Sequence, residues 1–340
     1  MSSGEKMIEL DGSLGEGGGQ MLRTALGLSA VLGKPFFMKH IRAGRARAGL
    51  QNQHLKVVEL MQKLTDAKVA GNVIGSMELT FVPSRRPQGS IALDTGTAAS
   101  LTLMIQPLLI ATLAGGDLAI DLKGGTDVPM APTCDYAKAV ELGILGKFGL
   151  VASLDIVRRG YYPRGGGRLR FWARGWSPPP INVRRAQEIR EARVIAVACS
   201  LPRRVAEREV NSAAQVIASE LGINPEISIS LCSDSVGTTV LALADTGTSF
   251  LGSDSLGERG KPAEIVGKEA AMSLIAEVKS GASVDVHMGD MLLPFIALSG
   301  GSFTVREQTP HMISNAYVIR QFTGREVKFE REGSLWRVSA

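Results

Sequence analysis

The sequence predicts an α+β fold, a two-layer arrangement in which three βαβαββ repeats pack around one core and a smaller α+β domain is inserted. A pattern of strand, glycine-rich turn, helix, glycine stop and second strand occurs three times along the 340 residues. A separate run of strands and helices follows Pro178-Pro179-Pro180. We therefore expect a large catalytic domain at residues 1–184 and 281–340, and an inserted small domain at 185–280.

The first repeat is indicated by alternating apolar residues and by glycines that end its helices. A helical pattern begins after a glycine-rich turn and stops at Gly33, a residue type that commonly ends helices. A small sheet cannot bury its own apolar face, so the unit needs neighbours to form a core. Its expected elements are strands at 8–11, 36–41, 67–69 and 78–82, and helices at 19–32 and 53–64.

The second and third repeats follow the same order of elements. The glycine stops are Gly115-Gly116 in the second repeat and Gly300-Gly301 in the third. For the second repeat we expect strands at 91–94, 118–122, 150–157 and 168–172, and helices at 98–113 and 133–148. For the third we expect strands at 284–287 and 303–306, and helices at 290–298 and 314–322.

The inserted segment has the pattern of an independent domain. It is about ninety residues long, which is within the usual range for a unit with its own core. Its expected elements are strands at 193–200, 226–231 and 238–245, and helices at 206–221 and 263–279.

The composition excludes several classes of protein. Hydrophobic residues make up 44% of the chain and charged residues 21%, which is typical of a folded globular protein. Residues 1–10 lack the apolar run of a signal peptide, and the most apolar stretch, 100–114, is interrupted by Gln106 and Pro107 and is shorter than the roughly 18–20 residues of a membrane span. We expect a protein without a membrane anchor.

The cysteines predict neither a disulfide framework nor a metal site. There are three, Cys134, Cys199 and Cys232, which are far apart and form no Cys-x-x-Cys motif. Two of them lie inside strand-like apolar runs. The pattern favours a reducing cytoplasm.

Positive charge is concentrated in two segments. The net charge is +5, but residues 34–58 contain six Lys or Arg and no acid, and residues 156–185 contain eight arginines and no acid. Either segment could be a solvated basic surface or a site for polyanions. In the first segment small residues separate Arg42, Arg45 and Arg47, which leaves room for a phosphate to approach the backbone.

The corners between the second strand and second helix of each repeat carry the residues with the clearest chemistry. His311 lies at this corner in the third repeat, where a helix N-terminus offers unpaired N–H groups to a phosphate. The same corner holds Arg42 and Arg45 in the first repeat, and Asp127, Pro129 and Pro132 in the second. If the repeats are related by a three-fold-like arrangement, these corners converge on a common cleft.

The corners between each first strand and first helix include a glycine-rich turn at residues 12–20. Backbone N–H groups in such a turn can bind an anion, although the segment matches no established nucleotide-binding motif and a structural turn explains it equally well. Glu16 would repel a phosphate there unless a divalent metal lies between them, so Glu16 is the predicted metal ligand. We expect Gly289 and Asp290 to form the equivalent turn in the third repeat.

Taken together, these motifs closely resemble the RNA 3′-terminal phosphate cyclase family. The matching segments are Gly15-Glu16-Gly17-Gly18-Gly19-Gln20-x-x-Arg23, Ile41-Arg42-Ala43-Gly44-Arg45, Gln53-His54, Gly124-Gly125-Thr126-Asp127, Tyr162-Pro163-Arg164-Gly165-Gly166-Gly167 and His311-x-x-x-Asn315. The resemblance runs through the whole chain and implies three repeats of a fold like the C-terminal domain of the third bacterial translation initiation factor, plus an inserted small domain. It also implies ATP and a divalent metal, Mg²⁺ or Mn²⁺, and an RNA with a 3′-phosphate as substrate.

The resemblance implies a nucleotidyl transfer in which His311 is the nucleophile that becomes linked to AMP. It assigns the metal to Glu16 and phosphates or RNA to Arg42 and Arg45. The family's nucleotide-binding positions are matched by Arg23, Gln53, Gln106, Pro132, His287, Met288, Gly289, Asp290 and Met291. The sequence departs from the family at His287, where many members have a tyrosine that stacks on the base.

Three other functions are compatible with parts of the pattern. A non-catalytic paralogue of the family acts in ribosome assembly and lacks the nucleophile, whereas this chain has His311. An RNA-end-binding module would need only the two basic segments. An enzyme resembling the enolpyruvyl transferases would use similar repeats on small phosphorylated substrates.

Overall fold

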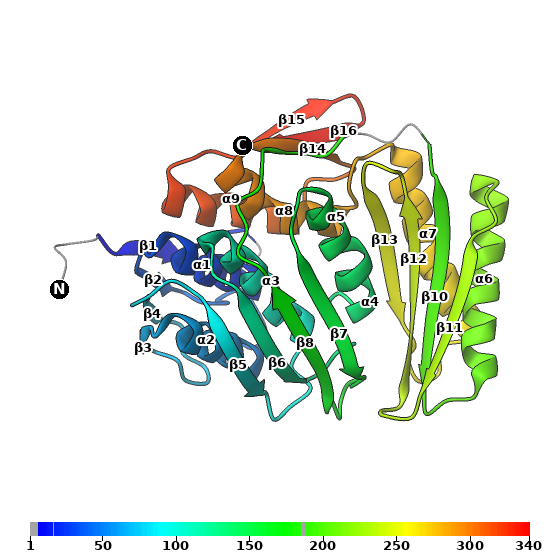
Figure 1. Cartoon of the computed structure of the whole chain (residues 1–340), viewed down its shortest axis with the longest axis horizontal. Helices are drawn as coiled ribbons and strands as arrows, with labels where there is room; N and C mark the ends of the chain where they lie inside the picture. The colour runs from blue at the N-terminus through cyan, green and yellow to red at the C-terminus, as the bar shows by residue number, and fades with distance from the viewer. Residues whose placement is uncertain (1–5, 16, 185–187) are drawn as a thin grey trace.

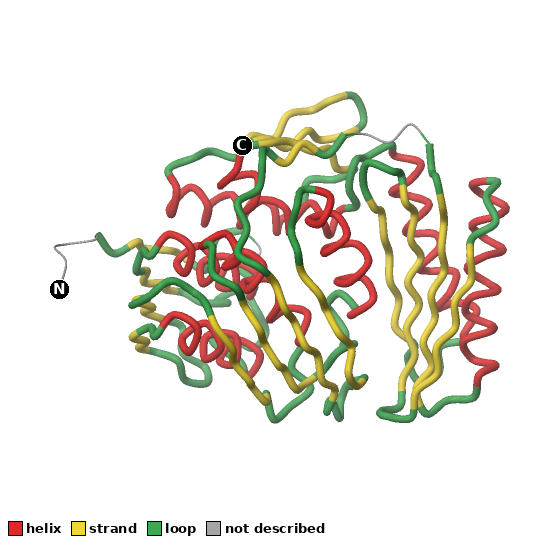
Figure 2. Tube along the Cα trace, in the orientation of Figure 1, coloured by secondary structure: helices red, strands yellow, loops and turns green. Residues whose placement is uncertain are grey.

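The structure, a computed structural model, describes residues 6–15, 17–184 and 188–340 and confirms the α+β class. Three units each contain a four-stranded mixed sheet in which the first two strands are parallel and the remaining pairs are antiparallel. The helices lie between the sheets, so that the apolar faces of the three units meet in the middle of the large domain (Figures 1 and 2).

The first unit forms as its sequence pattern predicts. Its α1 begins after Gly18 and ends at Gly33, which has a φ of 70° and donates its N–H to the Ser29 carbonyl. A left-handed residue ends a helix most easily when it is glycine. The elements are β1 (Ile8–Asp11), α1 (Gly19–Leu32), β2 (Phe36–Lys39), α2 (Asn52–Thr65), β3 (Lys68–Ala70) and β4 (Leu79–Val82), with the strands in the order β1-β2-β4-β3.

The second unit repeats this topology. Its first helix begins three residues later than expected because the Ser100 hydroxyl accepts a hydrogen bond from the Leu103 N–H and caps it. The elements are β5 (Gly89–Asp94), α3 (Leu101–Ala111), η1 (Thr112–Ala114), β6 (Leu118–Gly124), the continuous helix α4 (Cys134–Tyr136), η2 (Ala137–Glu141) and α5 (Leu142–Lys147), β7 (Ala152–Arg158) and β8 (Gly167–Ala173), with the strands in the order β5-β6-β8-β7.

The third unit corrects the sequence-based prediction. Residues 284–287 are not a strand, because the Asp285 side chain accepts a hydrogen bond from the Met288 N–H and caps a helix that begins at Val286. The first strand is instead Ile181–Asn182, which pairs in parallel with residues 301–302. The elements are β9 (Ile181–Asn182), α8 (Val286–Ser299), β14 (Gly301–Val305), α9 (Pro310–Thr323), β15 (Lys328–Glu332) and β16 (Leu335–Ser339).

The insert therefore interrupts the third unit, between its first strand and its first helix. Its sheet, in the order β11-β10-β12-β13, contains one strand more than the sequence pattern indicated, β13. The expected boundary at residue 185 lies among residues 185–187, outside the described part of the chain. The elements are β10 (Glu191–Cys199), α6 (Arg203–Leu221), β11 (Glu226–Cys232), β12 (Gly237–Asp245), β13 (Phe250–Leu256) and α7 (Ala263–Ser280).

Two hydrophobic cores account for this organisation. The larger core contains apolar residues of all three units, and the smaller one lies between the insert's sheet and its helices α6 and α7. Leu241 and Leu243 of β12 join the larger core. The other face of the insert's sheet is thus packed against the second unit.

The cysteine prediction is wrong for one pair. Cys199 and Cys232 form a disulfide, since they are direct neighbours in the register of the parallel strands β10 and β11. Their separation of 33 residues in the sequence gave no sign of this pairing. The cytoplasmic location stays a prediction, without the support that unpaired cysteines gave it. No helix in the described ranges has both the length and the apolar character needed to cross a membrane.

Candidate active site

One cleft of about 800 Å³ collects residues from the corners of all three units. The loop between β2 and α2 contributes Arg42 and Arg45, the loop between β6 and α4 contributes Pro129, and the first turn of α9 contributes His311. Repetition of the same topology brings these corners together, as the three-fold-like arrangement predicted.

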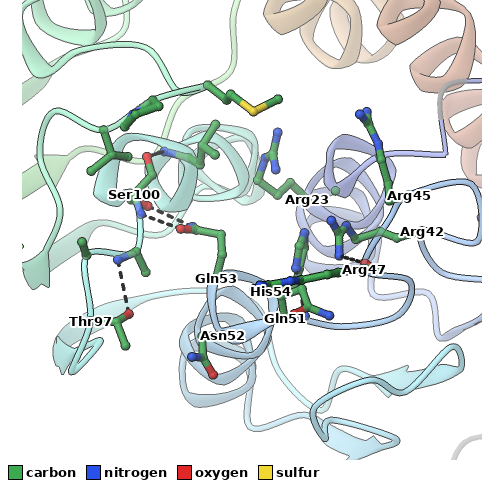
Figure 3. Close-up of a pocket in the computed structure, with 18 of the residues that line it drawn as sticks. Arg23, Arg42, Arg45, Arg47, Gln51, Asn52, Gln53, His54, Thr97 and Ser100 are labelled. Atoms are coloured by element: carbon green, nitrogen blue, oxygen red, sulfur yellow. Dashed lines mark hydrogen bonds between the residues drawn. The ribbon is translucent and has the colours of Figure 1, made fainter. Parts of the chain in front are cut away.

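The cleft is strongly electropositive. Arginines gather along one side of it, and no Asp or Glu occurs among the described residues that line it (Figure 3). Guanidinium groups bind phosphates through charge-assisted hydrogen bonds. The arginines are Arg23, Arg42, Arg45 and Arg47.

His311 is the second residue of α9 and is half-buried at the edge of this cleft. The helix is capped by the Thr309 hydroxyl, which accepts a hydrogen bond from the Met312 N–H at 3.0 Å. Burial lowers the pKa of His311, and the nearby charges of Arg23 and Arg45 lower it further. The imidazole is therefore neutral near pH 7 and retains a nucleophilic nitrogen.

The glycine-rich turn lies directly beside these side chains. A Cβ atom at Gly18 would be 3.2 Å from Arg45 Nη2 and 3.7 Å from His311 Cε1. At Gly19 a Cβ atom would overlap the His54 ring. Glycine is therefore needed here for close approach of the backbone. Glu16, the predicted metal ligand in this turn, lies outside the described residues.

Arg42 helps to close its own loop. Its Nη1 donates a hydrogen bond to the Arg47 carbonyl at 2.6 Å (Figure 3). The same Nη1 donates to the Gly49 carbonyl at 3.0 Å. Partial burial lowers its pKa. Arg42 thus shapes the loop that presents Arg45 and Arg47, in addition to lining the cleft.

Arg23 connects the cleft to a group of buried polar residues on the first helices of the units. Its Nε donates to Gln106 Oε1 of α3 at 2.8 Å, and burial lowers its pKa to about 10. A second, much smaller cavity of about 10 Å³ lies behind it, lined in part by Gln106, Asp290 and Met291. Burial raises the pKa of Asp290 to about 7, although its carboxylate accepts a hydrogen bond from the Thr309 hydroxyl at 2.5 Å.

Gln53 lines the cleft but is engaged by the backbone of the second unit. Its Nε2 donates to the Ser100 carbonyl at 3.0 Å, and its Oε1 accepts the Ser100 N–H at 2.5 Å (Figure 3). This pair of hydrogen bonds joins α2 to the start of α3. The side chain therefore holds the first and second units together at the cleft.

Four other predicted nucleotide-binding residues lie outside the described lining of both cavities. His287 is exposed at the start of α8, close enough to His311 to lower its pKa. The Pro132 carbonyl accepts a hydrogen bond from the Thr102 hydroxyl at 2.7 Å.

The other two of these residues, Met288 and Gly289, lie on the buried side of α8. Met288 is fully buried. Gly289 lies inside the helix rather than in a turn before it, and a Cβ atom there would overlap the Met312 side chain and approach Val305 Cγ1 to 2.7 Å. This corrects the expected turn at Gly289-Asp290. The glycine permits close packing of α8 against α9 and β14.

Sequence reasoning assigned no role to His54, which lines the cleft. Burial and the charges of Arg23 and Arg42 lower the pKa of His54 to about 3, and its Nδ1 accepts the Gln51 N–H at 3.2 Å. His54 is therefore neutral, and it closes the capping box at the start of α2. The Gln53-His54 dipeptide in the first turn of the helix was the available signal.

The fold and the cleft define a class of protein. Three βαβαββ units with an α+β insert place arginines, a glycine-rich turn and a neutral histidine in one anion-binding cleft, so this is a repeat-built protein for phosphorylated substrates.

The particular family follows from comparison with known proteins. A family model described as RNA 3′-terminal phosphate cyclase matches residues 14–329, and the chain belongs to this family. Proteins named RNA 3′-terminal phosphate cyclase are 44% identical over 330 residues in Saccharolobus islandicus (96% of this chain, 97% of the relative) and 41% identical over 334 residues in Pyrococcus furiosus (97% and 96%). One from Methanopyrus kandleri is 41% identical over 331 residues, 93% of each chain.

Proposed function

We propose that this chain is an RNA 3′-terminal phosphate cyclase, which uses ATP to convert an RNA 3′-phosphate into a 2′,3′-cyclic phosphate. Family membership and the names of the relatives support the substrate and product classes. The observation that carries catalysis by this chain is the neutral His311 beside an arginine-lined cleft. A non-catalytic relative would not need a nucleophilic histidine at this position.

The proposed reaction has three steps. A ring nitrogen of His311 attacks the α-phosphorus of ATP, and the bond to the β-phosphate oxygen breaks to release pyrophosphate. An oxygen of the RNA 3′-phosphate then attacks the same phosphorus, displacing the histidine and forming RNA(3′)pp(5′)A. Finally the 2′-hydroxyl oxygen attacks the 3′-phosphorus, its proton is lost and AMP leaves.

The residues of the cleft can serve these steps by charge and position. Arg23 and Arg45, which both lie near His311, are suited to the phosphates of ATP, and Arg42 to the same phosphates or the RNA end. The vicinal 2′-hydroxyl is already held beside the activated phosphate, so the last step needs little beyond positioning. Asp290, with its raised pKa, can hold a proton near neutral pH.

The proposal includes ATP and a divalent metal, Mg²⁺ or Mn²⁺. The four arginines among the described lining residues supply the positive charge that a triphosphate needs. Glu16 remains the proposed metal ligand, and the described residues contain no group of three or more His, Cys, Asp or Glu side chains arranged to hold an ion. A bound metal would reduce repulsion among the phosphate oxygens. The steps above are assigned to this chain's own residues.

Covalent labelling tests the nucleophile. The protein is incubated with ATP labelled at the α-phosphate and with Mg²⁺ or Mn²⁺. Wild type should acquire an acid-labile, alkali-stable label, and His311→Ala should not. The control is His40→Asn, which alters an exposed histidine paired with Asp11 outside the cleft lining. Labelling of His311→Ala at the wild-type level would exclude this nucleophile, and an unlabelled wild type would favour an RNA-end-binding module.

Arginine substitutions test the phosphate contacts. Arg42→Ala and Arg45→Ala should each impair adenylylation or transfer to a 3′-phosphorylated oligonucleotide while the circular dichroism spectrum stays native. Arg168→Ala is the matched control, because Arg168 is exposed on β8 and pairs with Asp121. Full activity in both cleft variants would show that the proposed phosphate roles are wrong.

A further inference from the structure

The rim of the cleft exposes two large side chains far from the buried part of the site. Tyr162, in the loop between β7 and β8, is 66% exposed, and Met130, in the loop between β6 and α4, is 91% exposed. Both line the same cleft as His311. Single exposed apolar residues are common, but an aromatic ring and a thioether that share the rim of an arginine-lined cleft form a surface suited to a planar ligand.

Tyr162 is held in place by its neighbours in the chain. The preceding Tyr161 is buried, its ring lies against Gly237 of the insert, and its N–H donates to the Ser235 hydroxyl at 3.1 Å. The backbone at Tyr161 forms a bridge with Asp127. The chain turns at the next residue, and the Tyr162 side chain is exposed while that of Tyr161 is buried.

The far side of the same loop is fixed as well. The Gly165 N–H donates to the Tyr161 carbonyl at 2.8 Å. Gly165 has a φ of 62°, and a Cβ atom there would lie 2.8 Å from Ala98 Cα and 3.0 Å from the Thr97 carbonyl. The loop therefore packs tightly against the start of the second unit. Little conformational entropy is lost when a ligand contacts a ring presented on so constrained a loop.

The charge of the cleft identifies the kind of ligand. A single RNA strand presents phosphates along its backbone and unstacked bases to the side, and proteins bind such strands with basic grooves and aromatic platforms. Arg45 and Arg47 line the same cleft as Tyr162, and no described lining residue is acidic. The geometry points to Tyr162 as the stacking platform for a base upstream of the reacting 3′ end, with Met130 beside it. This inference rests on the proposed function and adds to it a binding position for the RNA strand.

The experiment compares two reactions in the same variants. Tyr162→Ala should raise the KM for a 3′-phosphorylated oligoribonucleotide by about 5- to 100-fold, the range expected when one base loses an aromatic partner. Covalent labelling by ATP alone should keep the wild-type rate. Tyr162→Phe, which preserves the ring, should restore the KM. Trp172→Ala is the matched control, because this partly exposed tryptophan lies on β8 outside the cleft lining.

Substrate length provides a second comparison. A nucleoside 3′-phosphate has no upstream base, so wild type and Tyr162→Ala should process it equally. An unchanged KM for the oligonucleotide in Tyr162→Ala would overturn the inference. So would a defect confined to labelling by ATP, which would place the adenine of ATP on Tyr162.

Direct binding separates this inference from the proposed function. Fluorescence anisotropy with the same oligonucleotide should show weaker binding by Tyr162→Ala than by wild type or Trp172→Ala, whether or not the protein turns over. An inactive wild type that nevertheless shows this difference would refute only the proposed function. If wild type is active and binds the oligonucleotide no more tightly than Tyr162→Ala does, only the stacking role of Tyr162 is refuted.

Discussion

The buried carboxyl group of Glu141 should make the free energy of unfolding depend on pH. Glu141 ends the π-helical turn η2, is 2% exposed and lines the small cavity with Arg23, Gln106 and Asp290. Its Oε2 accepts no hydrogen bond from any described residue. Burial raises the pKa of Glu141 from 4.5 to about 8. The folded protein therefore holds this carboxyl group in its protonated form at neutral pH.

The sign of the pH effect follows from proton linkage. Between about pH 4.5 and 8 the unfolded chain has released the Glu141 proton while the folded chain retains it, so the free energy of unfolding falls as the pH rises. Each pH unit changes this free energy by about 1.4 kcal/mol. Glu141→Gln is neutral at every pH and removes the effect. From pH 5.5 to 7.5 the variant should thus gain about 2–3 kcal/mol relative to wild type.

Denaturant unfolding at pH 5.5, 6.5 and 7.5 measures this difference. Other titrating groups are common to both proteins and largely cancel in the comparison. Glu59→Gln is the matched control: hydrogen bonds from Lys56 and Lys63 lower the pKa of Glu59, so it is ionised in both states throughout this range. Its difference from wild type should be constant with pH. A constant difference for Glu141→Gln as well would refute the buried, protonated carboxyl.

Three further predictions concern the cleft and its support. Gly289→Ala should destabilise the protein by about 1–3 kcal/mol, measured by denaturant unfolding, because its Cβ would overlap Met312; an unchanged midpoint would mean that α8 and α9 can separate freely. Gln53→Leu should slow adenylylation and lower the thermal unfolding midpoint, since the Ser100 N–H and carbonyl lose their hydrogen-bond partners. A wild-type rate together with a wild-type midpoint would show that Gln53 does not hold the first and second units together. The rate of labelling at His311 should stay level as the pH falls through 6.5 and decline only at lower pH, because its pKa is lowered; an inflection at or above 6.5 would contradict this environment.

The fold was predictable where elements are long and punctuated by glycine. Helix α1 has the bounds expected from its sequence, because a glycine-rich turn precedes it and Gly33 ends it. The third unit was misassigned because its first strand is only two residues long and its partner lies more than a hundred residues away, across the insert. The residues taken for that strand, 284–287, include a helix-capping aspartate, Asp285. Local pattern cannot distinguish a short strand from a capped helix start when the pairing partner is so distant.

The site was predictable in its charges but not in its contacts. The acid-free arginines at the corners do line one cleft, because equivalent loops of related units meet at one place. The engagement of Gln53 by Ser100, and of Arg42 by its own loop, depends on side-chain geometry that no sequence spacing encodes. Glu141 carries no motif. Its unusual environment results only from the packing of helices from different units.

The internal repetition explains why the buried polar group lies where it does. Arg23, Gln106 and Asp290 belong to α1, α3 and α8, the first helices of the three units, and they are the fifth, sixth and fifth residues of these helices. Three related helices thus present polar side chains at similar depth around a common centre, where apolar residues would otherwise complete the core. The hydrogen bond from Arg23 to Gln106 joins the first unit to the second, and the hydrogen bond from Thr24 to Asn315 joins the first unit to the third. Within the third unit, Asn315 donates to the Asp290 carbonyl. Because the first two hydrogen bonds cross unit boundaries, this polar group is complete only when all three units have packed together.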